Sequence, residues 1–130
     1  MVYWDVIVAT IVSMILGFTW FGPLFGRQWT KLMGITPAQV KAAKKKGMPS
    51  STYFWVILTN VVTVLVLSTF ISTLSMSDSL TVAFMIWLGF LAPIQLGMVL
   101  WEGRPWALYL LTTSYYLVNL LLTTAILVWL

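Results

Sequence analysis

Four long stretches of apolar residues divide the chain, and short polar segments separate them. The stretches run from about Val2 to Phe25, Tyr53 to Leu74, Leu80 to Trp101 and Trp106 to Leu130. Each is close to the ~20 residues with which a helix crosses about 30 Å of hydrocarbon. A segment in hydrocarbon must satisfy its own backbone hydrogen bonds, which a helix does. The pattern predicts an all-α membrane protein with four transmembrane helices in a single domain, residues 1–130.

The composition agrees with this fold class and excludes several kinds of chemistry. Charged residues make up 8% of the chain and hydrophobic residues 61%, whereas soluble domains carry roughly 25% charged residues. The chain has no Cys and no His, so disulfides, thiolate catalysis and the usual zinc and haem ligands are excluded. We therefore expect no cofactor and no metal site.

The basic residues are unevenly distributed along the chain. The loop of residues 27–52 holds six of the seven, and Arg104 lies between the third and fourth stretches. These two loops lie on the same side of a four-helix topology, and basic loops are retained in the cytoplasm. We predict a multi-pass protein of the cell (inner or plasma) membrane, with the first loop cytoplasmic and both termini on the outer face. The clustering beside a membrane segment also argues against nucleic acid as a partner.

A short cytoplasmic helix is expected within the first loop. Thr36-Pro37-Ala38-Gln39 has the pattern of a capping box with proline at the first helical position, and three lysines end the segment near Lys46. The lysines have two interpretations: they determine topology only, or they contact anionic lipid headgroups. The candidate headgroup contacts are Lys41, Lys44, Lys45 and Lys46.

Two motifs lie at the cytoplasmic ends of the odd-numbered stretches and form a candidate interface. The motif residues are Gly22, Pro23, Gly26, Arg27, Trp29, Glu102, Arg104 and Trp106. Gly22 and Gly26 have the spacing that allows close helix approach, and Pro23 should end or kink its helix. Glu102 and Arg104 have no second acid, nucleophile or His beside them, so an enzyme built on them is not expected. The motifs are similar to each other, which raises the hypothesis of a duplicated helical hairpin.

Polar residues inside the stretches form a candidate intramembrane seam. Its members are Asn60, Thr63, Gln95, Thr112, Tyr116, Asn119 and Thr123. The last four share one helical face, because they are spaced by four, three and four residues. Such groups turn inward and pair in a bundle. The seam has two interpretations: hydrogen bonds that fix helix packing, or a small polar pocket between helices three and four.

The same segments resemble a known family. The residues from Gly17 to Trp29, Gly89-Phe90 with Pro93, the segment Trp101 to Trp106, and Tyr115 to Val118 are similar to the bacterial domain-of-unknown-function family 1761. The resemblance covers nearly the whole chain in order. It implies a four-helix membrane protein of unassigned function and contributes no catalytic residues.

Two functional hypotheses follow from these observations. The first is a non-enzymatic membrane protein that acts through helix packing, as a homo-oligomer or as an accessory subunit of a larger membrane complex. The alternative is a small channel, carrier or lipid-binding protein that uses the polar pocket. Ion-coupled transport is disfavoured because the deep membrane segments hold no ionisable side chain other than Tyr. Membrane lipids are the expected partners in either case.

Overall fold

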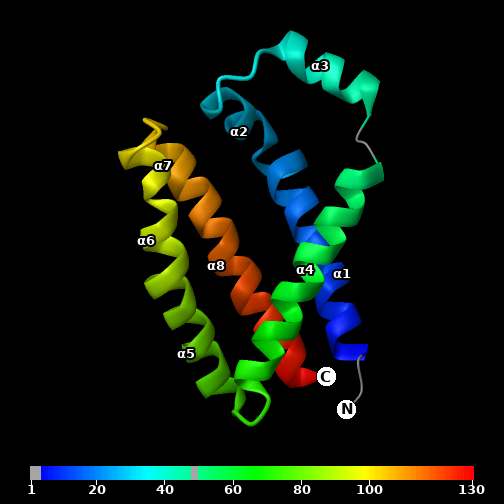
Figure 1. The fold of residues 1–130 in the computed structure, drawn as a ribbon, viewed down its shortest axis with the longest axis vertical. Helices are drawn as coiled ribbons and strands as arrows, with labels where there is room; N and C mark the ends of the chain where they lie inside the picture. Colours follow the sequence, from blue (N-terminus) through cyan, green and yellow to red (C-terminus); the bar gives the residue numbers. More distant parts are fainter. Residues whose placement is uncertain (1–3, 48–49) are drawn as a thin grey trace.

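The computed structural model describes residues 4–47 and 50–130 and contains only helices among them (Figure 1). Four helical stretches are long and apolar enough to cross a membrane: Trp4–Leu24, Ser50–Ile71, Met76–Leu100 and Trp106–Trp129. The all-α fold with four candidate spans is therefore confirmed. The predicted start at Val2 lies outside the described residues, as do loop residues 48–49.

Ten helical elements follow one another along the chain. They are α1 (Trp4–Thr19), η1 (Trp20–Leu24), α2 (Gly26–Leu32), α3 (Pro37–Lys46), α4 (Ser50–Ile71), α5 (Met76–Ile86), η2 (Trp87–Leu91), α6 (Ala92–Gln95), α7 (Gly97–Leu100) and α8 (Trp106–Trp129). The third span begins four residues before the predicted Leu80. The reason is local, because the Ser75 side chain accepts a hydrogen bond from the Asp78 N–H and caps the helix there.

The first and third spans each contain one turn of π-helix, η1 and η2. Pro23 lies inside η1 and lacks the N–H of a regular helix, so the ladder widens there rather than ending the span. Both π segments begin with a tryptophan that donates its indole N–H to a carbonyl of α8. The Trp20 bond to Leu111 O is 3.2 Å long and the Trp87 bond to Thr113 O is 2.8 Å long. These bonds anchor both irregular turns to the same helix.

Helix α8 is the centre of the bundle. It packs along α1 on one side and along α5 on the other, and α4 packs chiefly on α1 (Figure 1). Helices α4 and α5 are joined by a short turn at the end where both termini lie, and they touch little beyond it (Figure 1). The bundle is therefore tight around α1, α8 and α5 and splayed between α4 and the third span.

Small residues make the tight side possible. Ala9, Ser13 and Gly17 recur every four residues along α1, and Ala9 and Ser13 are almost completely buried. Ala83 of α5 is fully buried as well. In a bilayer, such small side chains let helix backbones approach closely. The small-residue spacing considered from the sequence was that of Gly22 and Gly26, not this one.

Helices α2 and α3 lie at the end of the molecule opposite the termini (Figure 1). The Thr36 hydroxyl accepts from the Gln39 N–H at 3.2 Å, and the Gln39 side chain accepts from the Thr36 N–H at 2.9 Å. This reciprocal pair is the capping box read from the sequence, and α3 has the bounds expected from it.

Candidate functional site

A cavity of about 430 Å³ lies beside the centre of α8 and collects part of the polar seam. It is lined by Val56, Thr59, Asn60, Thr63, Leu91, Tyr115, Tyr116, Asn119 and Leu120. Helix α4 and helix α8 supply all of these except Leu91, which comes from η2. The cavity therefore lies between helices two and four, not between three and four as the sequence suggested.

Asn60 on α4 has partners for both ends of its amide. Its Oδ1 accepts from the Ser13 hydroxyl of α1 at 2.7 Å, and its Nδ2 donates to the Val56 carbonyl at 2.8 Å. Ser13 is 1% exposed, so this hydrogen bond is shielded from both lipid and water. Asn60 thus joins α4 to α1, which is the packing role proposed for the seam.

Asn119 on α8 is in a different situation. It is 8% exposed, and its Oδ1 is buried without a hydrogen-bond partner among the described residues. An unpaired amide oxygen in an apolar environment costs about 1–3 kcal/mol, and no water is present in hydrocarbon to offset it. The side chain lines the cavity, but this oxygen is itself enclosed, so the amide must turn before a donor in the cavity can reach it.

Aromatic rings form the wall of the cavity toward α1 and η1. The Tyr115 ring lies 5.2 Å from that of Tyr116 and 5.0 Å from that of Phe21, measured between centroids. A Cβ built on Gly17 would stand 3.0 Å from the Tyr115 hydroxyl oxygen, so glycine makes room for this ring. The contacts with α1 and η1 hold the tyrosine wall in place.

The remaining members of the predicted seam lie elsewhere. Thr63 lines the cavity, but it is exposed and its hydroxyl donates to the Thr59 carbonyl at 2.9 Å. Thr112 is half-buried and Thr123 is buried, and neither lines the cavity. Gln95 lines a separate cavity of about 390 Å³ beside Glu102, with its own Oε1 unpaired. The structure therefore unites four of the seven seam residues.

The candidate interface after the first span is largely unpartnered within this chain. Gly22 is exposed, and no atom lies within 4 Å of a Cβ built there, so no helix of the same molecule approaches it. A Cβ on Gly26 would stand 2.8 Å from the Phe21 carbonyl oxygen. Glycine is therefore required at this position by the local backbone turn and not by a neighbouring helix. Trp29 packs its ring 5.9 Å from Phe21. Pro23 and Arg27 are exposed, and a contact with a second molecule stays a prediction.

The turn between the third and fourth spans has a structural explanation. Gly103 has φ of +68°, a conformation that glycine adopts without strain. The Arg104 N–H donates to the Met98 carbonyl at 2.9 Å, and Arg104 Nη1 lies 3.9 Å from the sulfur of Met33. Glu102 and Trp106 are exposed. The arrangement ties the turn to the end of α2 and brings no nucleophile to the Glu102 carboxylate.

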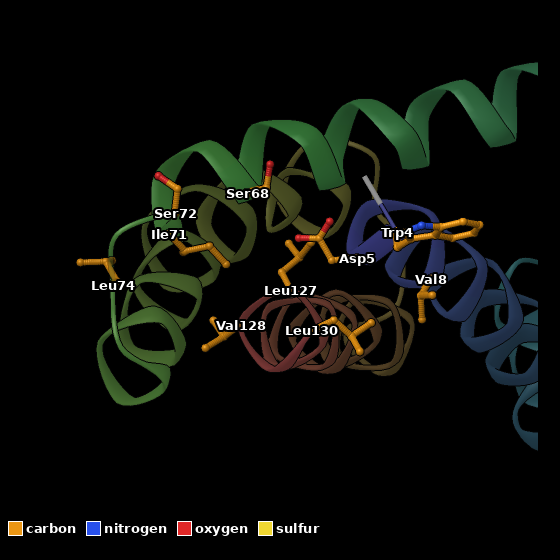
Figure 2. A pocket seen from close by; sticks show the side chains of 10 residues that line it. All are labelled: Trp4, Asp5, Val8, Ser68, Ile71, Ser72, Leu74, Leu127, Val128 and Leu130. Carbon is orange, nitrogen blue, oxygen red and sulfur yellow. The ribbon is translucent and has the colours of Figure 1, made fainter. Parts of the chain in front are cut away.

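A further cavity, of about 620 Å³, lies at the end of the bundle with the termini (Figure 2). Asp5 is its charged residue, and its Oδ1 accepts from the neighbouring Val6 N–H at 2.9 Å. Ser68 and Ser72 also line it, but their hydroxyls donate to carbonyls of their own helix. The cavity thus offers one carboxylate without a converging set of polar groups. Nothing in the sequence pattern pointed to this cavity.

The lysines of α3 divide into two pairs. Lys41 and Lys44 line a cavity between α2 and α3, together with Arg27 and Lys31. Lys45 and Lys46 are exposed and do not line it. In the described part of the chain, no group of three or more His, Cys, Asp or Glu side chains is placed to hold a metal ion.

Four apolar helical stretches of spanning length, three of them arranged around the fourth (α8), define the class as a helical protein with four candidate membrane spans. The family described as "Protein of unknown function (DUF1761)" matches residues 4–128. The chain therefore belongs to this family, which confirms the resemblance seen in its motifs. No match was found among curated proteins or among solved structures.

Proposed function

We propose that this protein binds an uncharged amphiphilic molecule, taken from the bilayer, in the cavity between α4 and α8. It would act as a small membrane carrier or as a ligand-binding subunit. The observation that carries this proposal is the Asn119 side chain, which lines the cavity and whose amide oxygen has no hydrogen-bond donor among the described residues.

The lining of the cavity specifies the chemistry of the ligand. The Asn119 amide can accept at Oδ1, once it turns toward the cavity, or donate at Nδ2, so a ligand with a hydroxyl group suits it because a hydroxyl does both. No Asp, Glu, Lys or Arg lines the cavity, which favours a neutral molecule. Leu91, Leu120 and Val56 provide an apolar surface beside the tyrosine rings, which suits an apolar body. The volume of about 430 Å³ lies within the range of ligand pockets, roughly 300–1,000 Å³.

The route to the cavity runs sideways from the membrane. The cavity is lined on one side by α4 and on the other by η2, which are the elements that diverge in the splayed part of the bundle. A ligand that is already dissolved in the lipid could enter between them without crossing the packed α1–α8–α5 side. This geometry supports a carrier or binder of lipid-soluble molecules rather than an aqueous pore.

Helix packing is the competing function and would use the same opening. A helix of a second copy or of a partner subunit could present a polar side chain to Asn119, as paired helices do in membranes. The protein would then be an assembly component, as the first sequence hypothesis holds. A useful experiment must therefore separate a small molecule from a protein as the occupant.

Site-specific photo-crosslinking in intact membranes makes this separation. A photoreactive benzoyl-phenylalanine replaces Thr63, which lines the cavity, or Thr69, which does not line it. The two threonines are matched controls, because both are exposed on α4 and both donate their hydroxyl to a carbonyl four residues earlier. The adducts are then identified by mass spectrometry.

The outcomes discriminate between the hypotheses. An adduct with one neutral small molecule at position 63 and not at 69 supports the proposal. A protein adduct at position 63 supports the assembly function and contradicts ligand binding. The same mixture of bulk lipids at both positions would show that the cavity is ordinary lipid-facing surface.

The orientation in the membrane is part of the proposal. The basic residues lie in or beside α2, α3 and the α7–α8 turn, at the end of the molecule opposite the termini (Figure 1). We expect this end in the cytoplasm, by the positive-inside rule. The chain has no cysteine, so single Lys45→Cys and Ser77→Cys variants report accessibility cleanly. An impermeant maleimide added to intact cells should label position 77 and spare position 45.

The non-enzymatic role and the duplicated hairpin are also proposals. We propose a non-enzymatic role, in which Glu102 and Arg104 stabilise a turn; Glu102→Gln should leave ligand binding unchanged. The duplicated hairpin has one observation in its favour, because both odd-numbered spans carry a π turn that begins with tryptophan. The packing is not two-fold, however, since α1 contacts α4 and α8 extensively while α5 contacts mainly α8.

A further inference from the structure

A second built cavity lies outside the bundle, at the end where the basic residues gather. It is an open cavity of about 860 Å³, lined by residues of α2, α3 and the segment that joins them. Four cationic side chains line it: Arg27, Lys31, Lys41 and Lys44. Ile35, Pro37 and Val40 supply an apolar floor beneath them.

The cationic side chains face the cavity because of helical spacing. Arg27 and Lys31 are four residues apart on α2, and Lys41 and Lys44 are three apart on α3, so each pair shares one helical face. No acidic residue lines the cavity. Asp5 and Asp78 lie at the opposite end of their spans, near the termini and the α4–α5 turn. The third acidic residue, Glu102, lies at the same end as the basic residues, in the turn before α8, but it lines a different cavity. Four like charges therefore face one space that has no acidic residue in its lining.

The link between α2 and α3 is short and hydrogen-bonded at both ends. Gly34 has φ of +76°, and the Ile35 N–H donates to the Thr30 carbonyl at 2.9 Å to close the end of α2. The capping box of Thr36 and Gln39 then starts α3 within two residues. Because both ends of the link are hydrogen-bonded, the freedom of α3 to move relative to α2 is limited.

We infer that this cavity binds the phosphate of an anionic phospholipid. Arginine and lysine side chains that converge on one space recognise phosphate groups. The phosphate source is assigned to a lipid because an adjoining cavity of about 750 Å³ shares Arg27, Thr30, Val40 and Lys44 with the basic one. That second space continues along Phe21, Leu24 and Trp29, at the end of the first span. It offers an apolar and aromatic surface where the glycerol and upper acyl chain of a phospholipid would lie.

This inference is independent of the proposed ligand cavity and differs from the lysine prediction made from sequence. It adds Arg27 and Lys31 of α2, which were not among the predicted headgroup contacts, and it leaves out Lys45 and Lys46. If net charge alone attracted the lipid, all four lysines of α3 would contribute equally. Removing two lysines that line the cavity can therefore be compared with removing two that do not, because the change in charge is the same.

The experiment titrates the purified full-length protein in neutral detergent with phosphatidylglycerol or with phosphatidylcholine of the same acyl chains, and measures binding by native mass spectrometry. The Lys31→Gln/Lys41→Gln variant removes two charges from the cavity, and the Lys45→Gln/Lys46→Gln variant removes two outside it. A lysine near anionic lipid contributes roughly a fivefold preference, so the first variant should lose about tenfold or more of the preference for phosphatidylglycerol. The second variant should stay within about twofold of the wild type, as should Asn119→Leu.

If the Lys31→Gln/Lys41→Gln variant does not fold, the single Lys41→Gln and Lys45→Gln variants replace the two double variants. Lys41→Gln should then lose about fivefold of the preference, and Lys45→Gln should not.

Two results would overturn the inference. An equal loss in both double variants would show that charge acts without a specific site. Binding of inorganic phosphate alone, with displacement of phosphatidylglycerol by excess phosphate, would assign the cavity to a soluble phosphate compound instead of a lipid. Failure of excess phosphate to displace the lipid supports the lipid as the occupant.

Discussion

Two asparagines line the same cavity from opposite walls and differ in what they bind. On α4, Asn60 accepts from Ser13 and donates to Val56, so its amide is used within the bundle. On α8, the buried Oδ1 of Asn119 has no partner among the described residues. Asparagine thus joins two helices at position 60 of α4, whereas at position 119 of α8 its acceptor oxygen is unpaired.

The hydrogen-bond partners of the two asparagines indicate which side chain contributes to helix packing and which is available to a ligand. In a bilayer a polar side chain seeks a partner from another helix, because lipid offers none. Asn60 finds this partner because α1 packs against α4 and presents Ser13 to it. Asn119 has no such partner for its Oδ1 among the described residues. The unpaired amide therefore marks the place where something outside this chain is expected.

The largest expected effect is on ligand binding when Asn119 is made apolar. Asn119→Leu should lower the amount of bound ligand by about tenfold to a hundredfold, since the ligand's donor would lose its acceptor in an apolar site. The free energy of unfolding should stay within about 0.5 kcal/mol of wild type or rise, because an unpaired buried acceptor is removed. Ligand retention and detergent-induced unfolding measure the two quantities on the same samples. A large loss in the free energy of unfolding would mean that Asn119 contributes to helix packing instead.

Asn60→Leu should show the reverse pattern. We expect a loss of about 1–2 kcal/mol in the free energy of unfolding, because the hydrogen bond between α1 and α4 disappears and Ser13 keeps an unpaired hydroxyl. A double-mutant cycle with Ser13→Ala should give a coupling free energy of about 0.6–1.7 kcal/mol. Zero coupling would mean that the 2.7 Å contact does not stabilise the bundle.

A smaller effect should follow from moving the tyrosine wall of the cavity. Gly17→Ala places a Cβ 3.0 Å from the Tyr115 hydroxyl oxygen, so the ring or α1 must shift, with a loss of up to about 1 kcal/mol in stability. Gly89→Ala is the matched control, because nothing lies within 4 Å of its added Cβ, and it should be neutral or stabilising by about 0.5–1 kcal/mol. Thermal unfolding of the two variants compares them directly. Equal effects would show that the Tyr115 contact is not tight.

The smallest effect is expected at Thr63, although this residue also lines the cavity. Its hydroxyl already donates to Thr59, so Thr63→Val should change stability by no more than about 0.5 kcal/mol and leave ligand affinity nearly unchanged. Thr63→Val and Asn119→Leu can be measured in parallel in the same binding assay. A tenfold loss of affinity in the threonine variant would move the binding group from α8 to α4.

The sequence predicted the elements of this molecule well and their arrangement less well. Span length and the Thr36 capping box depend on residues close in the chain, so the four spans and α3 could be derived from pattern alone. The position of the cavity depends on which helices touch. Gln95 and Asn119 were expected in one pocket, but the π turn η2 and the splay of α4 separate them. The Ala9, Ser13 and Gly17 spacing was the available signal for the tight side.

The candidate site was predicted only in part for a similar reason. The four-three-four spacing on α8 places four polar residues on one helical face, but spacing cannot tell whether a partner helix covers that face. Pairing of Asn60 with Ser13 involves residues 47 positions apart, which no local pattern encodes. The contribution of Arg27 and Lys31 to a cavity with Lys41 and Lys44 likewise depends on the angle between α2 and α3.

The most direct test of the account is native mass spectrometry of the wild-type protein and the Asn119→Leu variant, each extracted gently from the membrane of the cells that produce it. The account predicts that wild type carries a neutral small molecule at a defined ratio per chain and that the variant has lost most of it while remaining folded. Equal retention by both proteins, or a wild-type protein that carries no small molecule and is joined instead to another polypeptide, would contradict the assignment of the cavity between α4 and α8 as a ligand site.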